Sequence, residues 1–274
     1  MEVRYINVAS QHARSEFVER NFVEYCPSTW RLRRVEAVTI EEVLADKLPG
    51  TLRHAEKACF KSHLRALGLP SAETGPVLIV EDDVLFGAES GEFIEAALGV
   101  LDDDEWDILY PDVAITTPQE MLELFLHRQQ MQATGKRRGL LDAASLRFAG
   151  ATAYIVNRTA LARVIALLGR DGAMNMPVDL LLRDAVHRGE LRARIIFPFA
   201  TSLSVHAENS QVQTDASMVA ERVWNAYRRL MWCGAEPQKA TVGLASIPDS
   251  FYDAETDAFV GILRAFLARK FEDK

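Results

Sequence analysis

Short apolar runs alternate along the chain with longer segments in which apolar residues recur every three or four positions. The short runs predict strands and the longer segments predict helices. The predicted strands are Val3–Val8, Leu32–Val38, Pro76–Val80, Trp106–Tyr110, Ala151–Val156 and Arg194–Phe197. The predicted helices are Arg14–Tyr25, His54–Leu67, Phe93–Leu101, Thr117–Gln132, Thr159–Leu168 and Val178–His187. Strands that alternate with helices indicate an α/β fold with right-handed crossovers.

The segment Pro76–Val80 is apolar throughout, with no alternation of apolar and polar residues. A strand of this kind is typically buried on both faces, as in the centre of a mostly parallel sheet. We therefore expect a mostly parallel central sheet flanked by helices.

The pattern changes near Asp215. Ser217–Cys233 and Asp253–Phe271 predict two amphipathic helices, with no convincing strand between them. We expect residues 1–212 to form the main α/β domain and residues 213–274 to form a helical extension packed on it.

The composition is that of a globular protein and narrows the range of partners. The 274 residues are 49% hydrophobic and 26% charged, and the formal net charge is −8. An acidic balance argues against a nucleic-acid-binding surface, because phosphate contacts need clustered Lys and Arg. The acidic balance does not exclude a nucleotide as a ligand, since a metal ion can supply the positive charge that its phosphates need.

Three widely separated cysteines, Cys26, Cys59 and Cys233, follow no metal-binding spacing. An odd and sparse set indicates reduced thiols in a cytosolic protein. The first ten residues reach an apolar strand without the architecture of a signal peptide, and no apolar run approaches the length of a membrane span. We expect a soluble cytoplasmic protein that can still rest on a membrane surface.

The most informative segment is Glu81-Asp82-Asp83, which directly follows the predicted buried strand. Adjacent carboxylates at such a position are costly unless a positive group lies beside them. In open α/β sheets, ligands bind beyond the carboxyl ends of the strands. The triplet therefore suits Mg²⁺ or Mn²⁺ held together with substrate phosphates, and the alternative is a solvated acidic turn. Phosphohydrolases and nucleotidyltransferases also place acids at this position.

Further segments follow in a fixed order and resemble glycosyltransferase family 25, the lipooligosaccharide-biosynthesis and collagen-galactosyltransferase group. The resembling segments are Tyr5–Val8 with Arg14, Ala37-Val38, Ala58–Leu64, Leu78–Val84, Gly150–Val156 with Ala160, Met176–Asp179, and Phe197-Pro198 with Ser204 and Ser210. Three positions depart from the family pattern. Val8 replaces Leu, Thr39 follows Ala37-Val38 without the usual Gly in that turn, and Ala58 replaces Gly.

The resemblance implies a GT-A-like fold, with residues 1–212 as the catalytic domain. It also implies an inverting transfer of a sugar, typically galactose from UDP-galactose, to a glycan acceptor such as lipooligosaccharide. A divalent cation, Mn²⁺ or Mg²⁺, would stabilise the leaving UDP.

Donor-binding roles can be carried over to four residues outside the acidic triplet. Asn7 and Arg14 would form the nucleoside pocket, and Ser62 and His63 would contact a phosphate or the sugar, with Arg53 or Lys57 earlier on the same helix. The alternatives are a surface arginine for Arg14 and a buried, hydrogen-bonded histidine for His63.

Metal and catalytic roles concern the acidic triplet and two later residues. Asp83 is assigned to the metal and to catalysis, while Glu81 or Asp82 would contact the ribose or the metal. Asp179 would be the general base on the acceptor hydroxyl, or alternatively an N-terminal cap of its helix. His206 is a third candidate metal ligand, or alternatively a solvated loop residue.

Two other features bear on partners. The basic loop Lys136-Arg137-Arg138 is either solvated or meets an anionic acceptor. The last predicted helix carries an apolar stripe that would dock on the core, form a homodimer contact or rest on the inner membrane. The competing functions are a catalytically silent sugar-nucleotide-binding protein and a metal-dependent phosphohydrolase.

Overall fold

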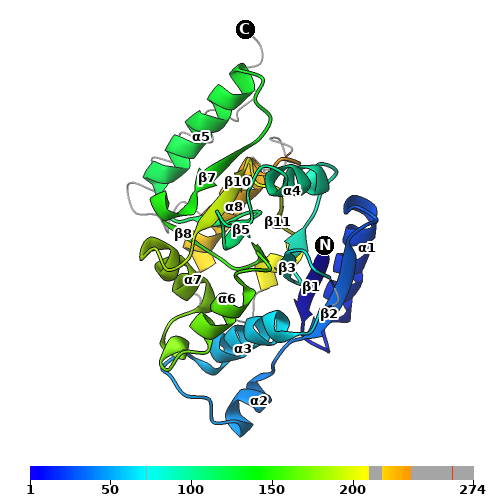
Figure 1. The fold of residues 1–274 in the computed structure, drawn as a ribbon, viewed down its shortest axis with the longest axis vertical. Coiled ribbons are helices and arrows are strands. Elements are labelled where there is room, and N and C mark those ends of the chain that lie inside the picture. The colour runs from blue at the N-terminus through cyan, green and yellow to red at the C-terminus, as the bar shows by residue number, and fades with distance from the viewer. Residues whose placement is uncertain (72, 210–217, 236–260, 262–274) are drawn as a thin grey trace.

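The computed structural model describes residues 1–71, 73–209, 218–235 and 261. Its centre is a seven-stranded sheet with the order β2-β1-β3-β9-β5-β10-β7 (Figure 1). These strands are β1 (Glu2–Asn7), β2 (Arg31–Glu36), β3 (Val77–Glu81), β5 (Ile108–Tyr110), β7 (Gly139–Asp142), β9 (Ala153–Val156) and β10 (Ala193–Phe197). The predicted α/β class is confirmed.

Most strands of the sheet run in one direction. β1 is parallel to β2 and to β3, and β10 is parallel to β5. β9 is antiparallel to its neighbours β3 and β5, and β7 is antiparallel to β10. Only β9 and β7 are therefore reversed among the seven, so the sheet is mostly parallel, as predicted.

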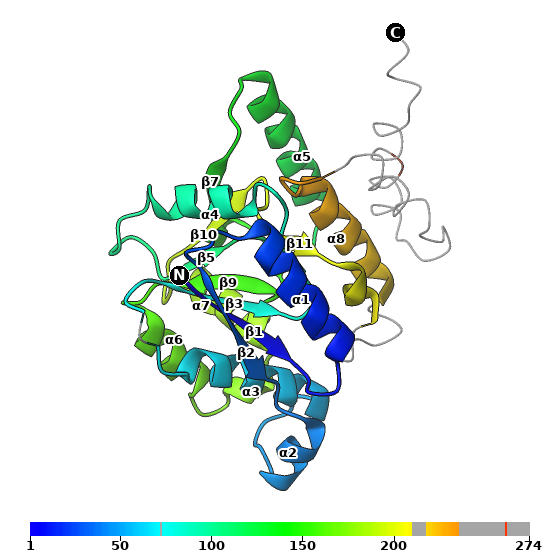
Figure 2. The same cartoon turned by 90° about the vertical axis from the view of Figure 1, so that its right-hand side faces the viewer.

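Helices cover both faces of the sheet. The helices are α1 (His12–Tyr25), α2 (Ile40–Ala45), α3 (His54–Gly68), α4 (Ser90–Leu98), α5 (Pro118–Ala133), α6 (Leu161–Leu168), α7 (Val178–His187) and α8 (Met218–Met231). Figure 2 shows α1 in front of the sheet. Buried side chains of α1 and α4 share one core with the sheet, and those of α3, α5, α6, α7 and α8 share the other.

The strand β3 separates these two cores. Val77 and Ile79 belong to the core under α3, and Leu78 and Val80 belong to the core under α1. All four side chains are at most 1% exposed. The absence of alternation in this segment therefore reflects burial on both faces, as the sequence predicted.

Several short elements were not predicted. Helix α2 begins at a capping box formed by Thr39 and Glu42. β7 forms the edge of the sheet directly after the predicted basic loop. β4 (Val84–Leu85) pairs with β11 (Ser202–Leu203), and β6 (Ala114–Ile115) pairs with β8 (Phe148–Ala149). Three 3-10 helices cover Ala143–Ser145, Ala173–Asn175 and Val205–Asn209.

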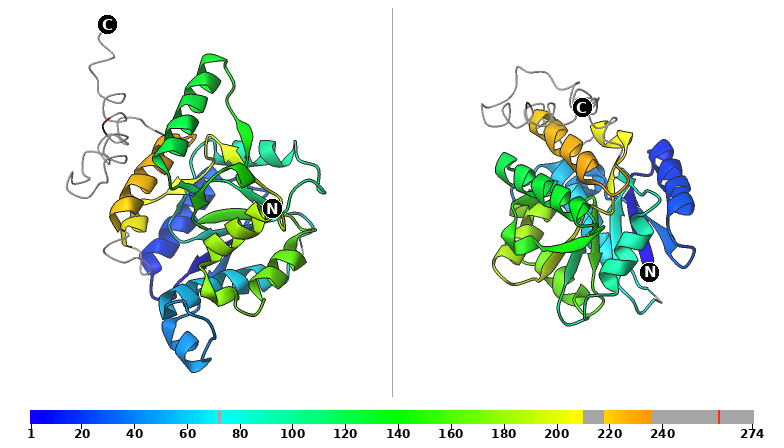
Figure 3. Two further views of the ribbon diagram at one scale, coloured as in Figure 1. Left: turned by 90° about the vertical axis from the view of Figure 1, so that its left-hand side faces the viewer. Right: turned by 90° about the horizontal axis from the view of Figure 1, so that it is seen from above.

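Helix α8 corresponds to the predicted helix Ser217–Cys233 and is part of the core. Val223, Tyr227 and Met231 are buried, and the Tyr227 hydroxyl donates to the carbonyl of Met121 on α5 at 2.7 Å. α8 lies alongside α5 (Figure 3). The predicted helix Asp253–Phe271 lies outside the described residues. Within the described part of the chain, no helix has the length and apolar character needed to cross a membrane.

Candidate active site

A cavity of about 420 Å³ lies beyond the carboxyl ends of β1 and β3. Its polar lining includes Arg14 on α1, Ser62 and His63 on α3 and the acidic triplet at the end of β3. The lining residues that the sequence singled out for function are Arg14, Ser62, His63, Glu81, Asp82 and Asp83. Parallel strands that end at the same edge explain why segments far apart in sequence meet here.

Asp82 is held by two of the predicted nucleoside-pocket residues. Asn7 Nδ2 donates to Asp82 Oδ2 at 2.8 Å, and an Arg14 guanidinium nitrogen donates to Asp82 Oδ1 at 2.6 Å. Asp82 is 7% exposed, so both of its oxygens are paired within the protein. This carboxylate fixes Arg14 at the cavity wall and ties the end of β1 to the end of β3.

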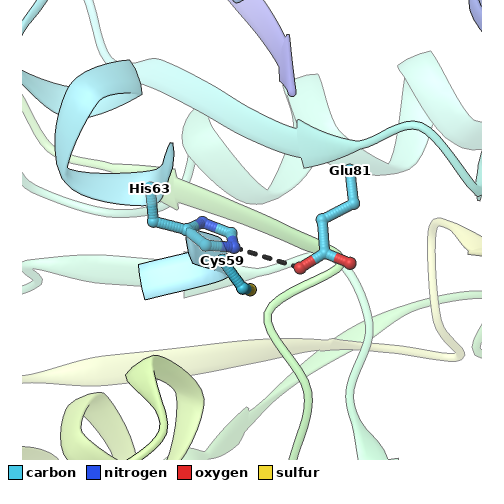
Figure 4. Close-up of side chains that lie close together, drawn as sticks. All are labelled: Cys59, His63 and Glu81. Carbon is cyan, nitrogen blue, oxygen red and sulfur yellow. Dashed lines mark hydrogen bonds and ion pairs between the residues drawn. The ribbon is translucent and has the colours of Figure 1, made fainter. Parts of the chain in front are cut away.

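Glu81 is hydrogen-bonded to a buried histidine. His63 is 1% exposed, and its Nε2 lies 3.0 Å from Glu81 Oε1 (Figure 4). Its Nδ1 lies 3.1 Å from the Tyr154 hydroxyl. Burial acts to raise the pKa of Glu81, but the hydrogen bond from His63 and the charges of Arg228 and Arg14 hold it below its usual value. Because an ionised carboxylate only accepts, Nε2 carries the proton and Tyr154 donates to Nδ1.

Asp83 is the least satisfied carboxylate of the triplet. Its Oδ1 is fully buried and has no hydrogen-bond partner among the described residues. Burial, followed by the charges of Glu81 and Asp82, raises the pKa of Asp83 to about 7. The backbone nitrogen of Ser204 donates to the Asp83 carbonyl at 2.8 Å, which fixes the main chain of this residue. An unpaired buried carboxylate oxygen beside a second carboxylate fits the donor set of Mg²⁺ or Mn²⁺.

A buried ion pair next to the cavity was missed by the sequence analysis. Arg228 on α8 donates to Asp112 Oδ2 at 2.7 Å, and the two side chains are 4% and 0% exposed. The positive charge of Arg228 lowers the pKa of Glu81 and opposes the rise in the pKa of Asp83. Local sequence carries no signal for this pair, because its members lie 116 positions apart.

Asp179 lies in the first turn of α7 but makes no capping bond to that helix. Its Oδ2 instead accepts a hydrogen bond from the backbone nitrogen of Gly150 at 2.8 Å. Gly150 has a φ of 94°, a conformation that favours glycine. Asp179 is not among the residues that line the cavity, but its charge contributes to the raised pKa values of Cys59, which does line it, and of Tyr110.

Two other predicted site residues have protein partners of their own. The Ser62 hydroxyl donates to the Ala58 carbonyl at 2.7 Å and accepts from the Val38 nitrogen at 2.8 Å. The ring of His206 packs edge-on against Phe17 with centroids 5.2 Å apart, and its carbonyl accepts a hydrogen bond from Arg14. Ser62 therefore connects the loop before α2 to α3. The His206 carbonyl contacts Arg14, which lines the cavity.

The two basic residues at the start of α3 are also engaged. Lys57 Nζ donates to the Leu48 carbonyl at 2.8 Å, and Arg53 pairs with Glu56 at 3.0 Å. These contacts hold the first turn of α3 and the chain before it.

Comparisons with known proteins identify the class of enzyme. Among curated protein sequences, none matches the chain. The solved apo structure of mouse xyloside xylosyltransferase 1 is similar with 12% identity over 69% of each chain, at a TM-score of 0.37. Residues 11–182 match the family described as glycosyltransferase family 25 (LPS biosynthesis protein). This segment spans well over half of the chain and includes α1, α3 and the acidic triplet, so the chain belongs to glycosyltransferase family 25.

Proposed function

We propose that this glycosyltransferase is an inverting enzyme that moves galactose from UDP-galactose to a glycan acceptor such as lipooligosaccharide. A divalent cation, Mn²⁺ or Mg²⁺, would neutralise the departing UDP. The observation that carries the proposal is the buried and unpartnered Oδ1 of Asp83 at the wall of the cavity.

The charges around Asp83 support a cation site. Asp83 and Glu81 present two carboxylates to one cavity, and their mutual repulsion contributes to the raised pKa of Asp83. A bound dication would remove this repulsion and would give the Asp83 oxygen the positive partner that it lacks. Asp83 and Glu81 are therefore the residues that would hold the metal, and His206 is a third candidate from the adjoining loop.

The cavity also suits a nucleotide sugar. Its volume of about 420 Å³ falls within the range of roughly 300–1,000 Å³ that is usual for small-molecule sites. Ile6, Val8, Ala37 and Val38 give it an apolar side, and Arg14 gives it a fixed positive charge. We assign the apolar side to the base and ribose, and Arg14 to the diphosphate side, with Asp82 and Asn7 orienting Arg14.

Asp179 is the proposed general base. Its contact with the Gly150 nitrogen orients the carboxylate, and the inverting reaction requires a carboxylate that accepts the proton of the acceptor hydroxyl. Asp179→Asn should therefore abolish transfer to an acceptor while leaving Mn²⁺-dependent UDP binding intact. Calorimetry with UDP and Mn²⁺ measures the second property independently of the first.

The direct test is release of UDP from a panel of UDP-sugars with Mn²⁺. Wild type should release UDP from UDP-galactose, and Asp83→Asn should lose at least about 100-fold in rate, because it loses the group that stabilises the leaving charge. Asp104→Asn, the same substitution at an exposed acid, is the matched control and should behave as wild type.

Two outcomes would contradict the proposal. UDP release that persists in Asp83→Asn would show that Asp83 does not take part in the reaction. In the other outcome, no UDP-sugar of the panel releases UDP and no acceptor receives a sugar, while UDP and Mn²⁺ bind tightly. That result would identify a binding protein that lacks turnover.

A further inference from the structure

Three side chains with metal-binding atoms meet on one wall of the cavity. Cys59 and His63 lie one turn apart on α3, and Glu81 faces them from the end of β3 (Figure 4). The thiol sulfur, an imidazole nitrogen and a carboxylate oxygen all lie within 4.8 Å of one another. All three residues line the cavity.

We propose that Cys59, His63 and Glu81 form a site for a thiophilic divalent cation, with Zn²⁺ as the best match. A sulfur, a nitrogen and an oxygen ligand together suit Zn²⁺, whereas Mg²⁺ and Mn²⁺ prefer oxygen. Three protein ligands leave the fourth tetrahedral position open to the cavity. The site shares Glu81 with the hard-cation site proposed above but takes its other two ligands, Cys59 and His63, from α3. The proposal therefore goes beyond the function proposed above.

The surroundings of His63 already have the arrangement of a metal-bound histidine. The ring is 1% exposed, and Tyr154 holds its Nδ1 from the side away from Glu81. A histidine that binds a metal through one nitrogen is usually fixed by a hydrogen bond at the other. With the cation on Nε2, the ring proton moves to Nδ1 and is donated to the Tyr154 oxygen, so the imidazole stays neutral.

The Cys59 thiol must lose its proton for the cation to bind. Burial, followed by the charges of Glu81, Asp179 and Asp83, raises the pKa of this thiol well above its usual value. These same carboxylates attract a dication, which replaces the thiol proton, and one proton per bound cation goes to solvent. Within the described ranges, no comparable group of three ligands surrounds Cys26 or Cys233.

The test uses Co²⁺ alone, without any nucleotide, and reads the near-ultraviolet charge-transfer band of a cobalt–thiolate bond. The double variant Cys26→Ser/Cys233→Ser leaves the cluster intact and should show the band at one Co²⁺ per chain. Cys59→Ser should lose it. Zn²⁺ should displace Co²⁺ from the double variant stoichiometrically, and a large excess of Mg²⁺ should not.

The proposal is overturned if the double variant gives no band, or if Cys59→Ser retains it. The double variant keeps Cys59, His63 and Glu81, so its band tests the proposal even if Cys59→Ser fails to fold. Because no nucleotide is present, failure of this test leaves the proposed sugar transfer standing. Failure of sugar transfer likewise leaves the cobalt result unaffected.

Discussion

Two aspartates at opposite ends of the sheet have buried carboxylate oxygens but differ in the donors that surround them. Asp107 directly precedes β5 and is 1% exposed. Arg163 donates to its Oδ1 at 2.9 Å, and the backbone nitrogen of Arg192 donates to its Oδ2 at 2.7 Å. Asp83 follows β3 at the other end, and its buried Oδ1 has no partner among the described residues.

The difference supports a structural role for Asp107 and the ligand-binding role proposed for Asp83. The donors around Asp107 join α6, the start of β5 and the chain before β10, and leave neither oxygen unpaired. Asp83 lies instead beside two other acids, and its pKa rises to about 7. Burial alone therefore does not mark a functional acid. For Asp83, the unmet hydrogen-bonding capacity together with the neighbouring carboxylates is what supports the proposed role.

The largest expected change in stability comes from Asp107→Asn. The substitution removes the buried charge that pairs with Arg163 and Arg192, and should lower the free energy of unfolding by about 2–3 kcal/mol. Urea unfolding measures this loss. Binding of UDP and Mn²⁺ to the folded variant should match wild type. A selective loss of binding would contradict a purely structural role for Asp107.

Asp83→Asn should shift the stability in the opposite direction. In metal-free buffer at pH 8 the variant should gain about 1 kcal/mol, because it removes a buried charge that lies next to two like charges. The same variant should lose its thermal stabilisation by UDP and Mn²⁺. A metal-free variant less stable than wild type would indicate that Asp83 has a structural partner.

The pH dependence of stability tests the same contrast. The pKa of Asp83 is about 7 in the folded protein, against about 3.9 for an unfolded aspartate. The folded state thus holds this proton more tightly, so the stability contributed by protonated Asp83 is lost as the pH rises from about 4 to about 7 and changes little above that. The difference between Asp83→Asn and wild type, measured with EDTA, should therefore widen from pH 5 to pH 8. Parallel curves would contradict the raised pKa.

The smallest effect is expected in the basic loop. Arg138 pairs with Glu92 at 2.6 Å, but both side chains are substantially exposed. Arg138→Ala should change the free energy of unfolding by less than about 1 kcal/mol, as is usual for exposed pairs. A larger loss by urea unfolding would show that the cation–π contact with Phe93 adds to the pair.

The sequence predicted those parts of the fold that have a strong local pattern. β3 was recognised from its continuous apolar run, and α7 from its helical period after Pro177. β7 was missed because an edge strand of intermediate burial has little apolar contrast. α2 has only six residues, yet its Thr39–Glu42 capping box is a signal that could have located it.

For the candidate site, the sequence predicted which strand ends converge but not how the side chains pair. Asn7 and Arg14 were expected near the acidic triplet, and both contact Asp82. Cys59 was set aside because no second cysteine lies nearby, although its spacing of four from His63 places both on one helix face. The pairing of Arg228 with Asp112 depends on tertiary packing and has no local pattern.

Helix α8 has a consequence for how this enzyme can be divided or recombined. The family match ends at residue 182, yet Arg228 beyond it neutralises Asp112 and moderates the charge on Glu81 and Asp83. A chimera joined between residues 182 and 218 would keep every carboxylate of the site and exchange the buried cation Arg228 on α8. Grafting the segment from another protein would therefore change the electrostatic potential of the cavity, even with all lining residues intact.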